Sequence, residues 1–169
     1  FYVTNISNFY IFYLMERYSV SIEFGQVLIF LFMGMGVVGT FYGGILSDRI
    51  GRKNVILISV VMPIPLCVAL PYLPLWIASV LLVVIGGLVM ISFTVLVVYA
   101  QELVPTKIGT MAGLTVGLAF GMGAIGSIVI GRIIDLQGII LTMQYVSWLS
   151  LLMLIAVFLP KDKPQQGEV

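Results

Sequence analysis

Two long stretches without a single charged residue constrain the fold of this chain more than any other feature. No Asp, Glu, Lys or Arg occurs from residue 24 to residue 47 or from residue 54 to residue 101. Of the 169 residues, 9% are charged and 61% are hydrophobic, so the charged share is about a third of that in a soluble domain. A surface in contact with water cannot be built from such a chain. We therefore predict a membrane protein, which must be either a helix bundle or a closed barrel because backbone groups in lipid pair internally.

The apolar runs favour helices over barrel strands. Residues 80–90 are almost entirely apolar, whereas a barrel strand alternates apolar and polar side chains. A helix needs about 20 residues to cross the bilayer. We predict an all-α membrane protein with six transmembrane helices, at residues 1–18, 22–46, 53–72, 75–101, 106–131 and 139–159. Ser21 and Thr106 are the expected N-caps of the second and fifth helices.

A glycine-rich pattern occurs twice along the chain. Its first copy consists of Gly34, Gly36, Gly39, Gly44, Asp48 and Gly51. A shift of 87 positions turns these into Gly121, Gly123, Gly126, Gly131, Asp135 and Gly138. Six matches in register, one of them a rare aspartate, indicate an internal repeat.

The spacing of the repeat predicts two inverted three-helix units. An interval of 87 residues holds three helices, and an odd number of crossings reverses the orientation of the second unit. We expect the first unit at residues 1–73 and the second at residues 75–160, followed by a cytoplasmic tail at residues 161–169. The fourth helix begins near Leu75, so its counterpart would begin about a dozen positions before Phe1. The first unit is therefore expected to be truncated at its N-terminus.

The basic residues predict the orientation, because Lys and Arg concentrate in cytoplasmic loops. In the six-helix arrangement, six of them fall on one side and two on the other. The richer side holds Arg49, Arg52, Lys53, Lys107, Lys161 and Lys163, and the other side holds Arg17 and Arg132. We expect the turn around Arg49 and the C-terminus in the cytoplasm and the protein in the inner membrane.

The turn between the second and third predicted helices resembles a family signature. Residues 44–53 read G-I-L-S-D-R-I-G-R-K, which is similar to the signature loop of the major facilitator superfamily. Inverted three-helix repeats within a six-helix half are typical of that superfamily. Residues 12–17, 98–105 and 117–123 further resemble the C-terminal half of the fosmidomycin resistance proteins. The resemblance covers nearly the whole chain.

This resemblance implies half of a twelve-helix transporter and not an enzyme. The implied function is alternating-access, proton-coupled export of a drug such as the phosphonate fosmidomycin. The implied partners are a missing N-terminal six-helix half, the lipid bilayer and a small-molecule substrate, with no nucleic acid and a monomeric full-length protein. Import of an organic anion or sugar, or a membrane interaction module without transport, remain alternatives.

Protons are the implied coupling ion, and no cofactor is expected. Proton coupling requires a carboxylate with a movable pKa inside the membrane, and no predicted helix interior holds one. We therefore expect the proton carrier in the missing half. The chain has no histidine and a single cysteine, Cys67, so no metal site of the usual kinds is expected.

The charged turn is the first candidate functional site. Arg49 or Arg52 can pair with Glu102 at the end of the fourth helix. The resemblance implies a network that latches the cytoplasmic side while the outer side is open. Its candidate residues are Gly44, Asp48, Arg49, Gly51, Arg52, Lys53 and Glu102. Alternatively, the cluster serves only as a topology signal.

Polar residues inside the first and fourth helices form the second candidate site. A polar group in lipid is costly unless it faces a partner or a water-filled cavity. In the superfamily, the first helix of each repeat lines the central cavity. The candidates are Asn5, Asn8, Tyr13, Ser92, Thr94 and Tyr99. Hydrogen bonds between helices are the alternative.

Glycines at intervals of four predict close helix packing. They are Gly39 and Gly43 on the second helix and Gly109, Gly113, Gly117 and Gly121 on the fifth. Residues 34–39 and 121–126 both read G-x-G-x-x-G. Because both lie inside long apolar helices rather than after a strand, nucleotide binding is not expected.

Overall fold

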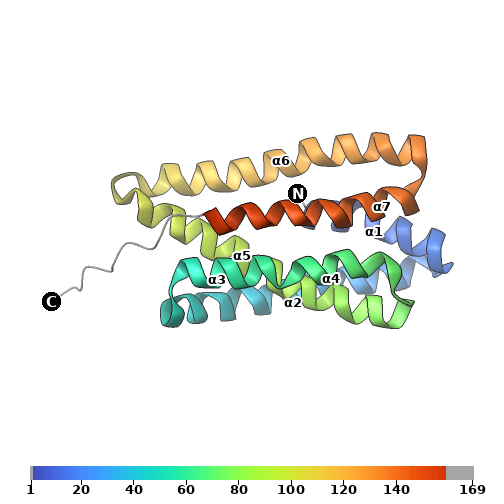
Figure 1. Ribbon diagram of the computed structural model, residues 1–169, viewed down its shortest axis with the longest axis horizontal. Coiled ribbons are helices and arrows are strands. Elements are labelled where there is room, and N and C mark those ends of the chain that lie inside the picture. The colour runs from blue at the N-terminus through green and yellow to red at the C-terminus, as the bar shows by residue number, and fades with distance from the viewer. Residues whose placement is uncertain (1, 159–169) are drawn as a thin grey trace.

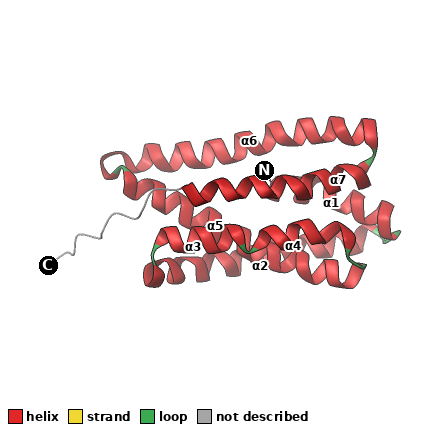
Figure 2. Cartoon of the chain, in the orientation of Figure 1, coloured by secondary structure: helices red, strands yellow, loops and turns green. Residues whose placement is uncertain are grey.

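The computed structural model describes residues 2–158, and every regular element in this range is helical (Figure 2). The elements are α1 (Tyr2–Tyr18), α2 (Ile22–Ile50), α3 (Arg52–Val61), α4 (Pro63–Ala69), η1 (Leu70–Tyr72), α5 (Leu75–Leu103), η2 (Pro105–Lys107), α6 (Ile108–Gln137), α7 (Ile139–Leu149) and η3 (Ser150–Phe158). The all-α fold is confirmed. The expected tail at residues 161–169 lies outside the described residues.

The described elements form six helical segments, because α3, α4 and η1 follow one another closely and α7 continues into η3. Four of the segments found in residues 2–158 are long and apolar enough to cross a membrane by themselves: Ile22–Ile50, Arg52–Tyr72, Leu75–Leu103 and Pro105–Gln137. The apolar segment Ile139–Ile155 is shorter, and α1 has 17 residues. The third segment is interrupted at Met62, where the following Pro63 cannot donate a backbone hydrogen bond.

Several helix ends differ from the prediction. Ser21 is confirmed as the N-cap of α2, because its side chain accepts a hydrogen bond from the Phe24 N–H at 3.4 Å. Thr106 is not an N-cap: it lies within η2, and α6 begins at Ile108 without a side-chain cap. α2 and α6 also continue four and six residues beyond their predicted ends at residues 46 and 131. Charged side chains end the apolar pattern, but they do not break the backbone hydrogen bonds of a helix.

Two glycines end these long helices in the same way. Gly51 after α2 has φ 86°, and Gly138 after α6 has φ 83°, a region that favours glycine. The Gly51 N–H bonds to the Ser47 carbonyl at 3.1 Å, and the Gly138 N–H bonds to the Ile134 carbonyl at 2.8 Å. Ser47 and Ile134 are 87 positions apart, as are the two glycines. The repeat inferred from the sequence is therefore also a repeat of backbone conformation.

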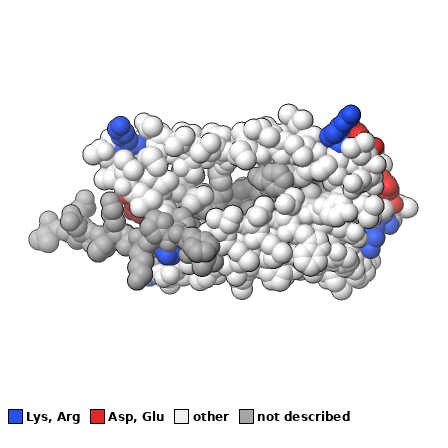
Figure 3. All heavy atoms as spheres, turned by 45° about the horizontal axis from the view of Figure 1, so that its top comes forward, with Lys and Arg blue, Asp and Glu red and all other residues white. Residues whose placement is uncertain are grey.

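The two glycine turns lie at opposite ends of the bundle (Figure 1). The α2–α3 turn with Asp48 is at one end, and the α6–α7 turn with Asp135 is at the other. Charged side chains gather toward the two ends, with a broad uncharged band between them on the face seen in Figure 3. The two three-helix units are therefore inverted relative to each other, as predicted.

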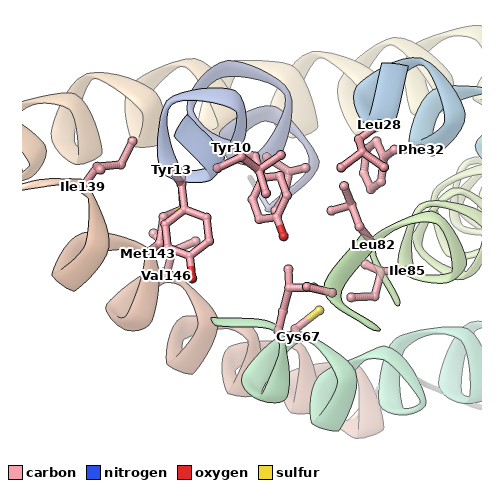
Figure 4. Close-up of a cluster of buried hydrophobic side chains, with 14 of the residues drawn as sticks. Tyr10, Tyr13, Leu28, Phe32, Cys67, Leu82, Ile85, Ile139, Met143 and Val146 are labelled. Carbon is pink, nitrogen blue, oxygen red and sulfur yellow. The ribbon is translucent and has the colours of Figure 1, made fainter. Parts of the chain in front are cut away.

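The units interleave in the folded bundle. The most extensive helix contact joins α2 of the first unit to α5 of the second, and α1 packs on α6 in the corresponding way. A buried cluster is shared by α1, α2, α4, α5 and α7 (Figure 4). It includes Tyr10, Tyr13, Leu28, Phe32, Leu82, Ile85, Met143 and Val146. Large apolar side chains also cover much of the outer surface, as expected where the solvent is lipid.

Gly39 provides a test of the α2–α5 contact. A Cβ at this position would overlap the Gly87 backbone, whereas a Cβ at Gly34 on the same helix would meet none of the described residues within 4 Å. We expect Gly39→Ala to destabilise the protein by about 1–3 kcal/mol because the overlap forces the helices apart. Gly34→Ala should be neutral or should stabilise the helix by up to about 1 kcal/mol. Thermal unfolding of the full-length protein in detergent measures both, and equal effects of the two substitutions would contradict this packing.

Candidate functional site

Arg52 and Glu102 form an ion pair at the end of the bundle that carries the α2–α3 turn. Arg52 begins α3 and Glu102 lies in the last turn of α5. The Arg52 side chain is 17% exposed and the Glu102 side chain 47%. The predicted pairing with Glu102 is therefore confirmed for Arg52.

Apolar packing beneath the ion pair fixes the relative position of α3 and α5. Val55 and Ile56 of α3 form a buried cluster with Val95 and Tyr99 of α5. These residues lie within two turns of Arg52 and Glu102 on the same helices. The ion pair thus joins two helix ends that are already held together by buried side chains.

The other residues of the predicted latch surround this pair. Asp48 and Arg49 are exposed in the last turn of α2, and Lys53 is half-buried in the first turn of α3. Gly51 provides the left-handed turn, and Gly44 has open space where a side chain would be.

Asn54 is a contributor to this turn that sequence reasoning missed. Its side chain donates a hydrogen bond to the Ile50 carbonyl at 2.8 Å, which satisfies an acceptor left over at the end of α2. An asparagine three residues after a turn glycine is the sequence pattern that could have revealed this hydrogen bond.

Three of the predicted cavity-lining residues lie inside the bundle. Asn5, Tyr13 and Tyr99 are only 0%, 1% and 3% exposed. Tyr13 donates a hydrogen bond to the Pro71 carbonyl at 3.2 Å, and Tyr99 packs against α3. The structure thus places these three side chains in the interior of the described bundle, and their role in lining a substrate cavity stays a prediction.

Two other candidates take part in polar bridges between helices. The Asn8 amide donates to the Ser127 hydroxyl at 3.3 Å, which joins α1 to α6. The Thr94 hydroxyl donates to the Thr40 hydroxyl at 3.3 Å, which joins α5 to α2. Both bridges are exposed. Ser92 is half-buried on α5.

Sequence reasoning did not find Thr40 or Ser127. They lie 87 positions apart, so the repeat could have revealed them. Their hydroxyls gave no signal alone, because such groups commonly bond to carbonyls within their own helix.

An apolar cavity of about 690 Å³ lies between α1, α5, α6 and the α7–η3 segment. Its wall is built mainly from methionine, phenylalanine and aliphatic side chains, including Met90, Phe93, Phe120, Met122 and Met153. None of the described residues that line it is charged. Among the described residues, no cluster of His, Cys, Asp and Glu could hold a metal ion.

The structure shows close packing at the α2 glycines and open space beside the α6 stripe within the described part of the chain. A Cβ at Gly39 would overlap Gly87, and one at Gly43 would approach Ile91 to 3.1 Å. A Cβ at any glycine of the α6 stripe would meet nothing within 4 Å in the described part of the chain: Gly109, Gly113, Gly117 and Gly121. α6 instead packs on α1 through Gly123, where a Cβ would lie 2.6 Å from the Thr4 hydroxyl. A spacing of four defines a stripe but does not indicate which way it faces.

The chain belongs to the Major Facilitator Superfamily, whose family model matches residues 1–169. Two curated relatives place it more closely. It is 51% identical over 158 residues to the uncharacterized MFS-type transporter YfnC of Bacillus subtilis (strain 168), covering 94% of this chain and 39% of that protein. It is 41% identical over 163 residues to the fosmidomycin resistance protein of Escherichia coli (strain K12), covering 96% of this chain and 40% of that protein.

The chain therefore spans about two-fifths of the length of these relatives. This agrees with the prediction of one six-helix half of a twelve-helix transporter. No solved structure shows significant similarity to the chain.

Exchange of the two charges tests the Arg52–Glu102 pair. Glu102→Arg should lower the stability of the full-length protein by up to about 1 kcal/mol because it places two positive charges together. Adding Arg52→Glu should restore most of this loss, because the pair is then reversed rather than removed. Thermal unfolding in detergent at low salt measures both effects. A double variant that is no more stable than the single variant would show that the two side chains do not interact.

Proposed function

We propose that the full-length protein exports a small anionic drug such as fosmidomycin in exchange for protons. The observation that carries this proposal is the 41% identity to the fosmidomycin resistance protein of Escherichia coli across 96% of this chain. The inverted repeats support an alternating-access mechanism, because transporters built in this way bind substrate near the middle of the membrane.

The distribution of charge supports different roles for this six-helix half and the other half of the full-length protein. In the described helices, Asp, Glu, Lys and Arg lie only in the turns near the helix ends. A proton carrier needs a carboxylate whose pKa can move toward neutrality within the membrane. We therefore assign proton coupling to the other half of the protein. We assign to this half the contacts that uncharged side chains make with the substrate.

The Arg52–Glu102 pair acts in this scheme as part of a latch at the cytoplasmic end. It ties the α2–α3 turn to the end of α5, while Asp48 and Arg49 remain exposed beside it. The exposed pair of charges is available to contact the other half when that end closes. Gly51 keeps the turn short and so holds these charges together.

The proposed orientation places the α2–α3 turn in the cytoplasm and the α6–α7 turn outside. We expect Asp48→Cys to react with a membrane-impermeant maleimide only from the cytoplasmic side, and Asp135→Cys only from the outside. Cys67 is buried and should contribute little background. Labelling of intact cells and of inverted vesicles, with the remaining cysteines replaced, measures this accessibility. Reaction of both positions from one side would contradict the inverted arrangement.

Export is tested by expressing the full-length protein in a fosmidomycin-sensitive bacterium. We expect sensitivity to decrease and drug accumulation to fall, and a protonophore should abolish both effects because it removes the driving force. Glu102→Arg in the full-length protein provides a variant with a disrupted latch, which should export more slowly at equal expression. Increased drug accumulation would favour an importer, and no change in accumulation would reject fosmidomycin as a substrate.

A further inference from the structure

Two polar bridges occupy corresponding places in the two inverted units. The first joins Thr40 to Thr94, and the second joins Ser127 to Asn8. Ser127 is the repeat equivalent of Thr40, and the equivalent of Thr94 is the residue next to Asn8. The repeat therefore preserves not only the backbone turns but also a side-chain bridge between neighbouring helices.

Both bridges lie deep within the apolar part of the bundle. Thr40 lies ten residues before the end of α2, and Asn8 lies ten residues before the end of α1. At 1.5 Å per residue, each is about 15 Å from its end of the bundle. A helix of 29 residues such as α2 is about 45 Å long, and the hydrocarbon core is about 30 Å thick. The bridges are therefore inside the hydrocarbon depth, on opposite sides of the middle.

The polar groups of these bridges are not covered by the described residues. Thr40 and Asn8 are exposed, and Thr94 and Ser127 are half-buried. An exposed amide at this depth costs free energy in contact with lipid, so such groups normally face a partner or water. The bridges thus mark a surface that does not face the lipid.

We propose that these two bridges line the substrate path and donate hydrogen bonds to the oxyanion of the substrate. This proposal rests on the proposed function and adds the residues and the chemistry of recognition. Asn8 uses one amide proton for Ser127 and keeps a second. The Thr94 hydroxyl has one proton and two acceptors, the Thr40 hydroxyl at 3.3 Å and the Met90 carbonyl at 3.1 Å. With substrate bound, Thr94 donates to Thr40, which leaves the Thr40 proton for the substrate. Ser127 and Thr94 are positioning residues, because they hold the two donors in place.

Neutral donors suit the acceptor oxygens of a phosphonate or carboxylate. Ionised oxygens of this kind only accept hydrogen bonds, and hydrogen bonds to them are stronger than those between neutral groups. The bridges carry no carboxylate that would attract a cation. Among the described residues that line the apolar cavity of about 690 Å³, only Thr4 and Ser150 are polar, so it is a poorer place for such a substrate.

Water accessibility tests the location of the bridges independently of transport. In the full-length protein with its remaining cysteines replaced, we expect Thr40→Cys and Asn8→Cys to react with a water-soluble maleimide. The control is Ile58→Cys, at an exposed apolar position on α3, which should face lipid and react slowly. If the cysteines at positions 40 and 8 react as slowly as the control, the bridges do not line an aqueous path and the proposal is overturned.

Transport kinetics test the chemistry with fosmidomycin as the probe. Thr40→Val and Asn8→Leu should each raise KM for export about tenfold with little change in kcat, as expected for loss of one hydrogen bond to a charged oxygen. Thr110→Val is the matched control, since Thr110 is exposed in the first turn of α6, and the KM of this variant should not change. An active wild type with unchanged KM in both variants overturns this proposal alone. An inactive wild type overturns the proposed export of fosmidomycin, and the labelling result then decides whether the bridges line an aqueous path.

Discussion

Backbone hydrogen bonding in a medium without water is the constraint on which this structure depends. No lipid group can replace an intrahelical bond, so a helix in this bundle continues until its carbonyls have another partner. α2 and α6 cross this medium as unbroken helices, stay helical through their charged last turns and end at Gly51 and Gly138. Side chains such as Asn54 then satisfy a carbonyl that remains. The charged residues of the α2–α3 turn are presented on rigid helix ends rather than on a loose loop.

Packing between the helices follows from the same medium. Lipid does not drive apolar helices together as water does, so close contact between small residues and hydrogen bonds between helices become important. The α2–α5 contact combines the approach of Gly39 to Gly87 with the Thr40–Thr94 bridge. The α1–α6 contact combines Gly123 against Thr4 with the Asn8–Ser127 bridge. The same kind of helix contact, a close approach at a glycine beside a polar bridge, thus occurs in both inverted units. It places polar groups at two depths in the membrane.

The sequence predicted the features that depend on rare residues. Charge is scarce in this chain, so the charged turn, its pairing with Glu102 and the repeated aspartates stood out against the apolar background. The sequence could not indicate which way a common residue faces. Glycines occur throughout, and only the folded structure shows that Gly39 is packed while Gly113 is exposed. Likewise, the polar side chains of Tyr13 and Asn8 within predicted helices indicated that each needs a hydrogen-bond partner. They could not indicate that Tyr13 is buried and Asn8 is exposed.

The interleaving of the two units has a consequence for how the protein is made. The first three helices leave the ribosome before α5 exists, although α5 supplies the surface on which α2 rests. Until residues 75–103 enter the bilayer, the glycine face of α2 and the Arg52 side chain lack the α5 residues that they contact in the folded bundle. Biogenesis therefore cannot proceed unit by unit. The helices of the first unit must remain in contact with lipid or with the insertion machinery until the helices of the second unit are inserted and pack against them.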